Sequence, residues 1–460
     1  MTSEIHSEFL VLGAGVSGLA IAHDLAVAGK EVTVIDKDSV VGGCAQTVSI
    51  GGFLFEKGPF NLLVRDPLFE GLVDQVSDRV EVVSYSDAAK RREIVRNGRR
   101  EPLPQSLMGA IKTPLLSPWG KVRLMLEPLL GRRPHDPDPT LGDLFRRRFG
   151  SQFVDRILSA AVVGIFAGDC NELSAKSCFR FFWEIDKDNW SFLVGGIKRR
   201  LTSRMNKRKW KGMVSFRGGL GSFCEALAHP VGDRLHLGTT VDRIEQQDGA
   251  YRVETHSASG ESQVFVTPHL ILGMDLKGAL PFLQELAPTV AQKLEPIESA
   301  SLAVVNLGFS SEAFEEPPVG FGFLVPEGER DIRVLGTLFA SSVFPHQAPE
   351  GCHSLRVFVG GYRQPDLLSL SDEELSHHAV SELSKLMEIK QAPLLVQVSR
   401  YPESIPQMVS GHSARIEEVE EDLKQHPGLH LVGNYLHGVS VNDCICHARR
   451  TAAELIGSDH

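Results

Sequence analysis

A glycine-rich segment near the start of the 460-residue chain has the residue types and spacing to bind a phosphate group. It follows the apolar run Phe9 to Leu12 and opens a stretch with helical spacing, Ser17 to Ala28. A glycine backbone can approach a pyrophosphate closely, and the positive N-terminal end of a helix stabilises the phosphate charge. The sequence therefore predicts a GxGxxG dinucleotide-binding turn made of Gly13, Ala14, Gly15, Val16, Ser17 and Gly18.

An acidic residue stands where a dinucleotide-binding domain needs one. The second predicted strand, Glu31 to Ile35, ends at Asp36, about twenty residues after the glycine motif. A carboxylate at this point accepts hydrogen bonds from the hydroxyl groups of a bound ribose. We include the next residue, Lys37, in the predicted cofactor site. The strand–helix–strand order together with the acid favours nucleotide binding over an ordinary tight turn.

Two further glycine-bearing segments indicate which dinucleotide binds. Gly42 and Gly43 follow Asp36 closely, and Gly433 and Asn434 follow a predicted strand near the other end of the chain. Two segments that are remote in sequence and close on one cofactor fit the long FAD molecule better than NAD. The alternative for Gly42 and Gly43 is a simple turn.

The remaining sequence divides into helical and strand-like patterns. Residues 91–211 have mostly helical spacing, with a helix start at Ser117 and a capping pair, Thr140 and Asp143. Residues 235–266 alternate between apolar and polar side chains, which predicts a β-meander. We predict an α/β fold with a GxGxxG-type FAD-binding domain, a β-rich substrate-binding domain and a helical insertion. The predicted boundaries are 1–75, 212–290 and 395–460 for the FAD-binding domain, 76–90 and 291–394 for the substrate-binding domain, and 91–211 for the insertion.

Composition argues against several classes of protein. The formal net charge of −10 argues against a nucleic-acid partner. The seven cysteines have neither zinc-ligand spacing nor a disulfide framework, so we expect no metal site and a reducing compartment. The sequence shows no secretory leader and no uncharged apolar run of about 18 residues, so we expect a cytoplasmic protein.

Positive charge is concentrated in the middle of the chain. The segment Lys198 to Lys211 carries eight Lys or Arg and no acid, with Trp210 among them. Leu103 to Leu130 offers apolar faces interrupted by prolines. Because cations near an anionic lipid surface contribute about 1 kcal/mol each, we expect peripheral attachment to the inner face of a membrane. The alternative is a solvated basic face.

Several longer motifs resemble one known family. They are GAGVSGLAIAHDLA, FEKGPFNLLVRDP, VVGIFAGDCNELSAKSCF, FRGGLGSFCEALA, YPESIPQMVSGH and VGNYLHGVSVNDCI. Together they resemble the oxygen-dependent protoporphyrinogen oxidases, within the superfamily of FAD-containing amine oxidases and phytoene desaturases. The first and last motifs are shared across the superfamily, whereas AGDCNELSAKSCF and the IPQ and GH pair are narrower. The resemblance covers nearly the whole chain.

The resemblance implies noncovalent FAD and further residues that bind it. Cys444 and Cys446 lack the Ser-Gly-Gly-Cys context in which some amine oxidases attach a flavin. For Val439 the alternative is plain strand core. Besides the residues named above, the implied cofactor contacts are Gly58, Val241, Gly433, Asn434, Gly438, Val439 and Ser440.

The resemblance also implies a substrate pocket. Arg96 matches an arginine that pairs with a substrate propionate, and the alternative is a solvated arginine. Leu324 and Phe344 match two residues that sandwich a pyrrole ring, with core packing as the alternative. The chain departs from the family pattern at Phe60, where many relatives carry a polar residue. A wall of the pocket is implied at Gly164, Ile165, Phe166, Ala167 and Gly168.

The implied reaction is the six-electron oxidation of protoporphyrinogen IX to protoporphyrin IX in heme biosynthesis. Flavin N5 would accept a hydride in each of three steps, and dioxygen would reoxidise the flavin with formation of hydrogen peroxide. No catalytic side chain is required, because the chemistry belongs to the flavin. The alternatives are a coproporphyrinogen III oxidase, a flavin amine oxidase or desaturase, and a non-catalytic flavin-fold binding protein. The sequence leaves the oligomeric state open, with a homodimer as one alternative.

Overall fold

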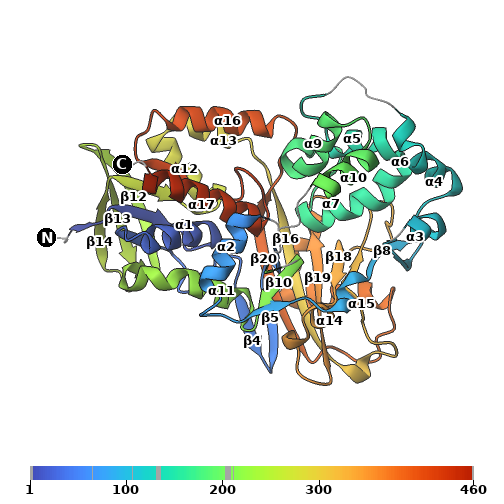
Figure 1. The fold of residues 1–460 in the computed structure, drawn as a ribbon. Helices are drawn as coiled ribbons and strands as arrows, with labels where there is room; N and C mark the ends of the chain where they lie inside the picture. The colour runs from blue at the N-terminus through green and yellow to red at the C-terminus, as the bar shows by residue number, and fades with distance from the viewer. Residues whose placement is uncertain are drawn as a thin grey trace.

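The fold is known from a computed structural model that describes residues 4–64, 66–105, 107–130, 136–202, 209–210 and 212–457. Figure 1 shows three regions: a sheet-and-helix region that holds both termini, a second region built on a large sheet, and a group of helices above that sheet. This arrangement confirms the predicted α/β fold class.

A five-stranded parallel sheet forms the centre of the first region. Its strands are short and almost fully buried, as expected for a parallel sheet covered on both faces. Segments from the beginning, the middle and the end of the chain alternate in it, so this region is discontinuous in sequence. The order is β11 (Leu235–His236), β3 (Val32–Ile35), β2 (Phe9–Leu12), β15 (His269–Leu272) and β21 (Leu429–Leu431).

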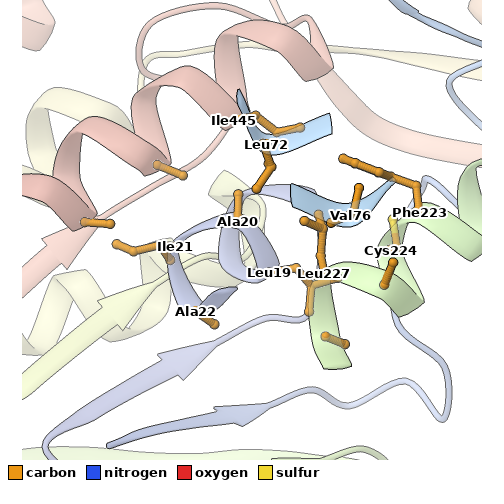
Figure 2. Close-up of a cluster of buried hydrophobic side chains, with 14 of the residues drawn as sticks. Leu19, Ala20, Ile21, Ala22, Leu72, Val76, Phe223, Cys224, Leu227 and Ile445 are labelled. Atoms are coloured by element: carbon orange, nitrogen blue, oxygen red, sulfur yellow. The ribbon is translucent and has the colours of Figure 1, made fainter. Parts of the chain in front are cut away.

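Helix α1 (Val16–Val27) packs deeply in this region. Figure 2 shows its apolar side chains among those of helices α2, α11 and α17. Ala20 and Ala22 are fully buried, and such small side chains let neighbouring helices approach closely. The packing fixes the direction of α1 and therefore the position of its N-terminus. The partner helices are α2 (Pro67–Val76), α11 (Gly219–Ala228) and α17 (Val441–Gly457).

The predicted β-meander is present as a four-stranded sheet beside the parallel sheet. Its hairpin turn at Asp248 and Gly249 has positive φ at both residues, the backbone geometry that a two-residue turn requires. Helices α12 (Leu276–Leu286), α13 (Pro288–Leu294) and α16 (His412–Leu423) complete the region. The sheet order is β1 (Glu4–His6), β14 (Ser262–Thr267), β13 (Ala250–Ser257) and β12 (Thr239–Gln247).

The large sheet has seven strands and two differently covered faces. Val95 and Phe323 lie in an apolar core together with α15 (Asp372–Ser384), whereas Ile94 and Leu324 face the helical region. The order is β20 (Leu395–Pro406), β16 (Ser299–Ser310), β19 (Cys352–Gly360), β18 (Gly336–Leu338), β17 (Gly322–Leu324), β8 (Arg92–Arg96) and β9 (Arg99–Pro102).

Strand pairing differs from the predicted boundaries in two places. Residues 92–102, predicted within the helical insertion, form β8 and β9, and β8 pairs in parallel with β17. Residues 395–406, predicted within the FAD-binding domain, form β20 and pair with β16. Both segments join the sheet because their backbones complete its hydrogen-bond ladder, a long-range contact that local spacing does not encode.

The smaller strands connect the two sheet regions. Strands β6 (Leu62–Val64), β10 (Gly212–Phe216) and β7 (Val82–Ser84) form a three-stranded sheet, which mixes segments that were predicted to lie in different domains. Strands β4 (Thr47–Ile50) and β5 (Phe53–Glu56) form a hairpin.

The helical region begins at Leu107 and has its own aromatic core. Both predicted helix starts are present: the hydroxyl of Ser117 accepts from the Gly120 N–H, and that of Thr140 accepts from the Asp143 N–H. A π-helical stretch, 154–158, joins α6 and α7 into one continuous helix. The helices are α3 (Leu107–Lys112), α4 (Pro118–Met125), α5 (Leu141–Phe149), α6 (Ser151–Phe153), α7 (Ser159–Phe166), α8 (Ala175–Cys178), α9 (Arg180–Asp188) and α10 (Phe192–Thr202).

A buried charge network ties these helices together. The Arg148 guanidinium donates to Asp186 Oδ1 at 2.6 Å and approaches Glu127 Oε1 at 3.5 Å. Glu127 also accepts from the Phe192 N–H at 2.7 Å and from the Ser191 hydroxyl at 2.6 Å. Since Glu127 and Arg148 are almost inaccessible to solvent, each one depends on the other's charge and on these hydrogen bonds.

We expect Glu127→Ala to destabilise the helical region by about 3 kcal/mol, because it leaves the buried Arg148 with less compensating charge. Denaturant unfolding and limited proteolysis of the helical region measure the effect. The control is Glu421→Ala, which removes an exposed pair with Lys424 and should change little. Equal behaviour of the two variants would contradict the structural role of the network.

Candidate active site

The glycine turn between β2 and α1 brings backbone segments into close contact. Gly13 has φ of +109°, and a Cβ there would lie 2.9 Å from the carbonyl carbon of Gly273. A Cβ on Gly18 would lie 2.0 Å from the Gly13 oxygen. Both positions therefore require glycine for the fold itself.

Gly15 differs from these two glycines because no described residue fills the space in front of it. Its φ is −73°, and a Cβ there would meet no atom within 4 Å. It caps α1 without any side-chain hydrogen bond, so the first N–H groups of the helix stay available. The Gly42 N–H donates to the Ala14 carbonyl at 2.8 Å, which brings the second glycine pair beside the first. This cradle fits the pyrophosphate of a dinucleotide.

Asp36 closes the nucleotide end of the site. Its carboxylate accepts hydrogen bonds from the backbone N–H groups of Ala14 and Asp38, and burial raises its pKa. Its own carbonyl accepts from the Thr239 N–H at 2.9 Å, so the start of β12 and Val241 lie beside it. Lys37 is exposed. These positions are consistent with the predicted ribose and adenine contacts, which remain predictions.

The C-terminal loop lies at the N-terminus of α17, which packs against α1. Gly438 has φ of +153°, and a Cβ there would lie 2.5 Å from Asp443 Oδ2. The Ser440 hydroxyl accepts from the Asp443 N–H at 3.1 Å and caps this helix, whereas Val439 packs against the helical region. Asn434 donates from Nδ2 to the Ser404 carbonyl at 3.0 Å. Packing of α17 on α1 thus brings the two predicted cofactor-binding segments together.

The two cysteines of α17 do not favour covalent attachment of a flavin. Both thiols are buried, and burial raises the pKa of Cys444 to about 12 and that of Cys446 to about 11. A thiol that stays protonated is a weak nucleophile. Noncovalent binding therefore stays our prediction.

The structure reveals a buried polar cluster that the sequence reasoning missed. Arg356 on β19 is almost fully buried and donates from Nη2 to the Gly58 carbonyl at 2.6 Å. Its guanidinium lies 5.4 Å from the centre of the Phe60 ring, and burial lowers its pKa to about 10. Arg356 therefore holds Gly58, a predicted cofactor contact, and brings a positive charge beside Phe60. The available signal was a single charged side chain within the apolar strand Cys352–Gly360.

Glu56 belongs to the same cluster. Its carboxylate accepts from the Leu220 N–H at 2.9 Å and from the Thr47 hydroxyl at 2.7 Å. No ion pair within 4.0 Å joins it to Arg356 in the part of the chain that the structure describes, and burial raises its pKa to about 7. This carboxyl group therefore titrates near neutral pH.

The predicted substrate wall forms where α7 crosses the large sheet. A Cβ on Gly164 would lie 2.6 Å from Leu324 Cδ2, so glycine allows the helix to approach β17. Leu324 is partly accessible, and Ala160 and Ile94 pack in the same apolar cluster. A Cβ on Gly168 would lie 2.0 Å from Gln407 Oε1. The wall is therefore made of small and aliphatic groups.

Two of the predicted wall residues, and Phe344 of the predicted sandwich pair, point away from the surface formed by Leu324. Phe166 points into the aromatic core of the helical region, 5.9 Å from the ring of Phe179. Ala167 is buried in a small apolar cluster at the end of α7. Phe344 is fully buried 5.4 Å from the Phe60 ring, in a different cluster from Leu324. The Phe344 ring is fully buried in this structure, and its predicted contact with a pyrrole ring stays a prediction.

Arg96 lies at the end of β8 and is half-buried. Among the described residues, no carboxylate lies within ion-pair distance of its guanidinium, in contrast to Arg91 and Arg100, which approach Glu93. A solvated arginine, the alternative interpretation of Arg96, would be more exposed than this side chain is. Arg96 is therefore free to bind an anion from outside the protein. In the C-terminal loop, His437 Nε2 forms a hydrogen bond with Glu420 Oε1 at 2.8 Å.

Comparison with known proteins places the chain among flavoproteins. The family described as flavin containing amine oxidoreductase matches residues 16–456. Protoporphyrinogen oxidase 2 of Arabidopsis thaliana is 29% identical over 97% of this chain and 93% of its own length. Coproporphyrinogen III oxidase of Bacillus subtilis is 28% identical over 97% of each chain.

Solved structures agree on the fold. A crystal structure from Exiguobacterium sp., assigned to the protoporphyrinogen oxidases, has a TM-score of 0.81 at 24% identity and covers 98% of this chain and 99% of its own. Reduced UDP-galactopyranose mutase has a TM-score of 0.72 at 16% identity and covers 98% of this chain and 96% of its own. At these identities the likeness shows the fold alone.

The fold and the glycine cradle define a dinucleotide-binding oxidoreductase, and the family match specifies the dinucleotide as FAD. The chain belongs to the flavin containing amine oxidoreductase family and is an FAD-dependent enzyme. The predicted resemblance to the protoporphyrinogen oxidases is confirmed by the relatives.

We expect Gly15→Ala to give a folded protein that has lost most of its FAD. Its Cβ would occupy the space of the pyrophosphate without touching the protein. Gly18→Ala should instead destabilise the fold, because its Cβ would clash with the Gly13 backbone. Circular dichroism and the flavin content after acid precipitation distinguish the two. A Gly15→Ala protein with full FAD content would contradict the cradle.

We expect the free energy of unfolding to fall as pH rises from about 4.5 to about 7, with Glu56 as one cause. The folded protein keeps a proton on Glu56 up to its raised pKa, whereas the unfolded chain releases it near its ordinary value of 4.5. Glu56→Gln should reduce this fall, and Glu261→Gln, at an exposed site, should not. Urea unfolding at about pH 5 and at about pH 7.5 measures the free energy of unfolding near the two ends of this pH range. An identical pH dependence in Glu56→Gln and the native protein would contradict the raised pKa.

Proposed function

We propose that this enzyme oxidises protoporphyrinogen IX to protoporphyrin IX, with dioxygen as the electron acceptor. The observation that supports this proposal is the half-buried guanidinium of Arg96, which has no carboxylate partner among the described residues and follows Ile94 of the apolar wall that includes Leu324. A flat, apolar macrocycle with propionate groups matches both features. The Arabidopsis relative is named a protoporphyrinogen oxidase, and this chain matches it over almost its whole length. This match supports the substrate class.

The chain's own residues position the substrate and exclude water. When bound, FAD accepts the hydride that the reaction removes from the macrocycle. Leu324, which is partly accessible, offers an apolar contact to the ring, Gly164 lets α7 approach Leu324, and Arg96 binds a propionate through a charge-assisted pair. The buried Arg356 holds Gly58 in position through its carbonyl. This arrangement orients the substrate, and the chemistry belongs to the flavin, so no side-chain base is needed.

Coproporphyrinogen III is the second candidate substrate. The Bacillus subtilis relative named coproporphyrinogen III oxidase is 28% identical, nearly the same as the Arabidopsis protein, and is matched over 97% of its length. The two substrates share the macrocycle and differ only in side chains. Both therefore fit an apolar wall with a carboxylate-binding arginine at its edge.

A direct comparison of the two substrates under air tests the proposal. We expect the FAD-loaded protein to form protoporphyrin, with hydrogen peroxide as co-product, at a higher kcat/KM than coproporphyrin. Porphyrin fluorescence and a peroxide assay follow the reaction. A reversed preference would favour the second candidate, and turnover of an amine without turnover of either porphyrinogen would overturn the proposal.

We further propose that the enzyme docks on an anionic membrane through α4 and the short turn after it. The exposed fractions of Trp119, Met125 and Leu129 are 81%, 66% and 78%. Large apolar side chains this exposed on one short segment are unusual in a protein that contacts only water. Figure 1 shows α3 and α4 at the outer edge of the helical region. Among the residues that the structure describes, no helix is long and apolar enough to cross a bilayer.

Positive charge complements this surface. Residues 90–148 hold fourteen Lys or Arg against six acids, and Lys112 is exposed on α3. Half of the basic segment on which the prediction rested, Lys198 to Lys211, lies outside the described residues, namely 203–208 and 211. Apolar insertion from α4 together with nearby cations would hold the protein on anionic lipids.

We expect the protein to float with anionic liposomes at low salt and to be partly released by high salt. The double variant Trp119→Ser with Leu129→Ser should lose flotation, whereas a double variant of Val27→Ser and Leu394→Ser should keep it. The control positions are exposed apolar residues elsewhere, with exposed fractions of 59% and 57%. Equal flotation of both variants, or no flotation of the native protein, would contradict the docking surface.

A further inference from the structure

The continuous helix from α6 to α7 crosses the large sheet above β17 and β8. A Cβ on Gly164 would lie 2.6 Å from Leu324 Cδ2. Ala160, one turn earlier, packs with Ile94 in one apolar cluster. Ile94 and Leu324 are neighbours in the parallel register of β8 and β17. Residues one helical turn apart on the helix therefore lie over successive positions of the strands. One turn before Ala160, the helix presents residue 156.

Arg96 and Arg156 occupy this next step. Successive strand residues point to opposite faces, so Arg96 faces the helix together with Ile94, whereas Val95 lies in the core on the other face. Arg156 lies about one helical turn before Ala160. Burial and, second to it, the positive charge of Arg96 lower the pKa of Arg156. Two guanidinium groups therefore lie near each other at one edge of the apolar wall.

Arg156 is oriented by the protein but is not neutralised by it. Its Nη1 donates to the Leu115 carbonyl at 3.2 Å and to Gln152 Oε1 at 3.3 Å. Within the described ranges, neither Arg156 nor Arg96 has a carboxylate within 4.0 Å, although both are half-buried. The buried Arg148, by contrast, lies 2.6 Å from Asp186. Two adjacent cations without a counter-charge repel each other, and an anion between them relieves this repulsion.

We propose that Arg96 and Arg156 together form a clasp for two carboxylates on neighbouring rings of the substrate, with one guanidinium for each carboxylate. This inference rests on the proposed function and extends it to a residue, Arg156, that binds and orients the macrocycle. The macrocycle lies along Leu324 and Gly164 while its acidic edge is held at the clasp. A planar guanidinium suits a carboxylate because it donates two parallel hydrogen bonds.

The clasp also explains how one pocket accepts related macrocycles. Protoporphyrinogen IX and coproporphyrinogen III share two propionates on adjacent rings and differ at the opposite edge. The clasp binds the edge that carries the two shared propionates, so it does not distinguish between the two substrates. Selection between the two substrates then depends on the groups that meet the opposite edge.

Binding of a stable porphyrin tests the clasp without any turnover. The probes are deuteroporphyrin IX, whose two propionic acids sit on adjacent rings, and its dimethyl ester. They are titrated into the FAD-loaded protein and followed by porphyrin fluorescence. The variants are Arg96→Leu, Arg156→Leu and Arg156→Gln, which keeps a donor for the Leu115 carbonyl. Arg180→Leu, at an exposed position of the same region, is the control.

We expect Arg156→Leu and Arg156→Gln to weaken binding of the diacid by about ten- to hundredfold and to leave binding of the ester unchanged. Arg96→Leu should behave in the same way, and the double variant should bind the diacid more weakly than either single variant. Arg180→Leu should change neither probe. Equal weakening of acid and ester in Arg156→Gln, with unchanged FAD content, would make Arg156 a structural residue only. Unchanged binding of both probes would place it outside the site.

These results separate the clasp from the proposed function. If the native protein binds the diacid in an arginine-dependent manner and oxidises no porphyrinogen, the proposed function fails and the clasp stands. If it oxidises porphyrinogens and Arg156→Gln binds the diacid like the native protein, the clasp fails and the proposed function stands.

Discussion

The close packing of α1 against the β2 turn is the constraint on which the rest of the structure depends. A Cβ on Gly18 would lie 2.0 Å from the Gly13 oxygen, so only glycine allows the helix to begin where it does. Burial of α1 against α2, α11 and α17 then fixes its direction. Through α17 the C-terminal loop is brought to the same place as the N-terminal turn. The site in front of Gly15 exists because these contacts, far apart in sequence, are satisfied together.

A second close approach defines the substrate side. Gly164 lets α7 come down onto Leu324, and the same crossing aligns Arg156 with Arg96. The helical region is itself held rigid by buried charges around Arg148, so the helix that crosses the sheet is well supported. In the proposed clasp, two cations that have no carboxylate within 4.0 Å among the described residues lie at the edge of an apolar wall, and this arrangement suits a flat molecule with acidic groups at one side.

Local sequence patterns predicted the elements whose causes are local. The GxGxxG turn, the strand that ends at Asp36 and the helix caps at Ser117 and Thr140 depend on neighbouring residues, and the structure confirms them. Sheet membership depends on partners far away, which explains why residues 92–102 were predicted in a helical region. Arg356 was missed for the same reason, because its partner Gly58 is about three hundred residues away. The buried position of Phe344 likewise depends on Phe60, which no local pattern reveals.

Anaerobic mixing of the purified protein with protoporphyrinogen IX tests the central claim most directly. The account predicts that the absorbance of oxidised FAD disappears as porphyrin absorbance grows, and that air restores the flavin spectrum with formation of hydrogen peroxide. Each porphyrin formed should consume three oxidised flavins, because six electrons leave in pairs. An oxidised flavin spectrum that persists while porphyrinogen remains, together with porphyrin formation no faster than without protein, would contradict it.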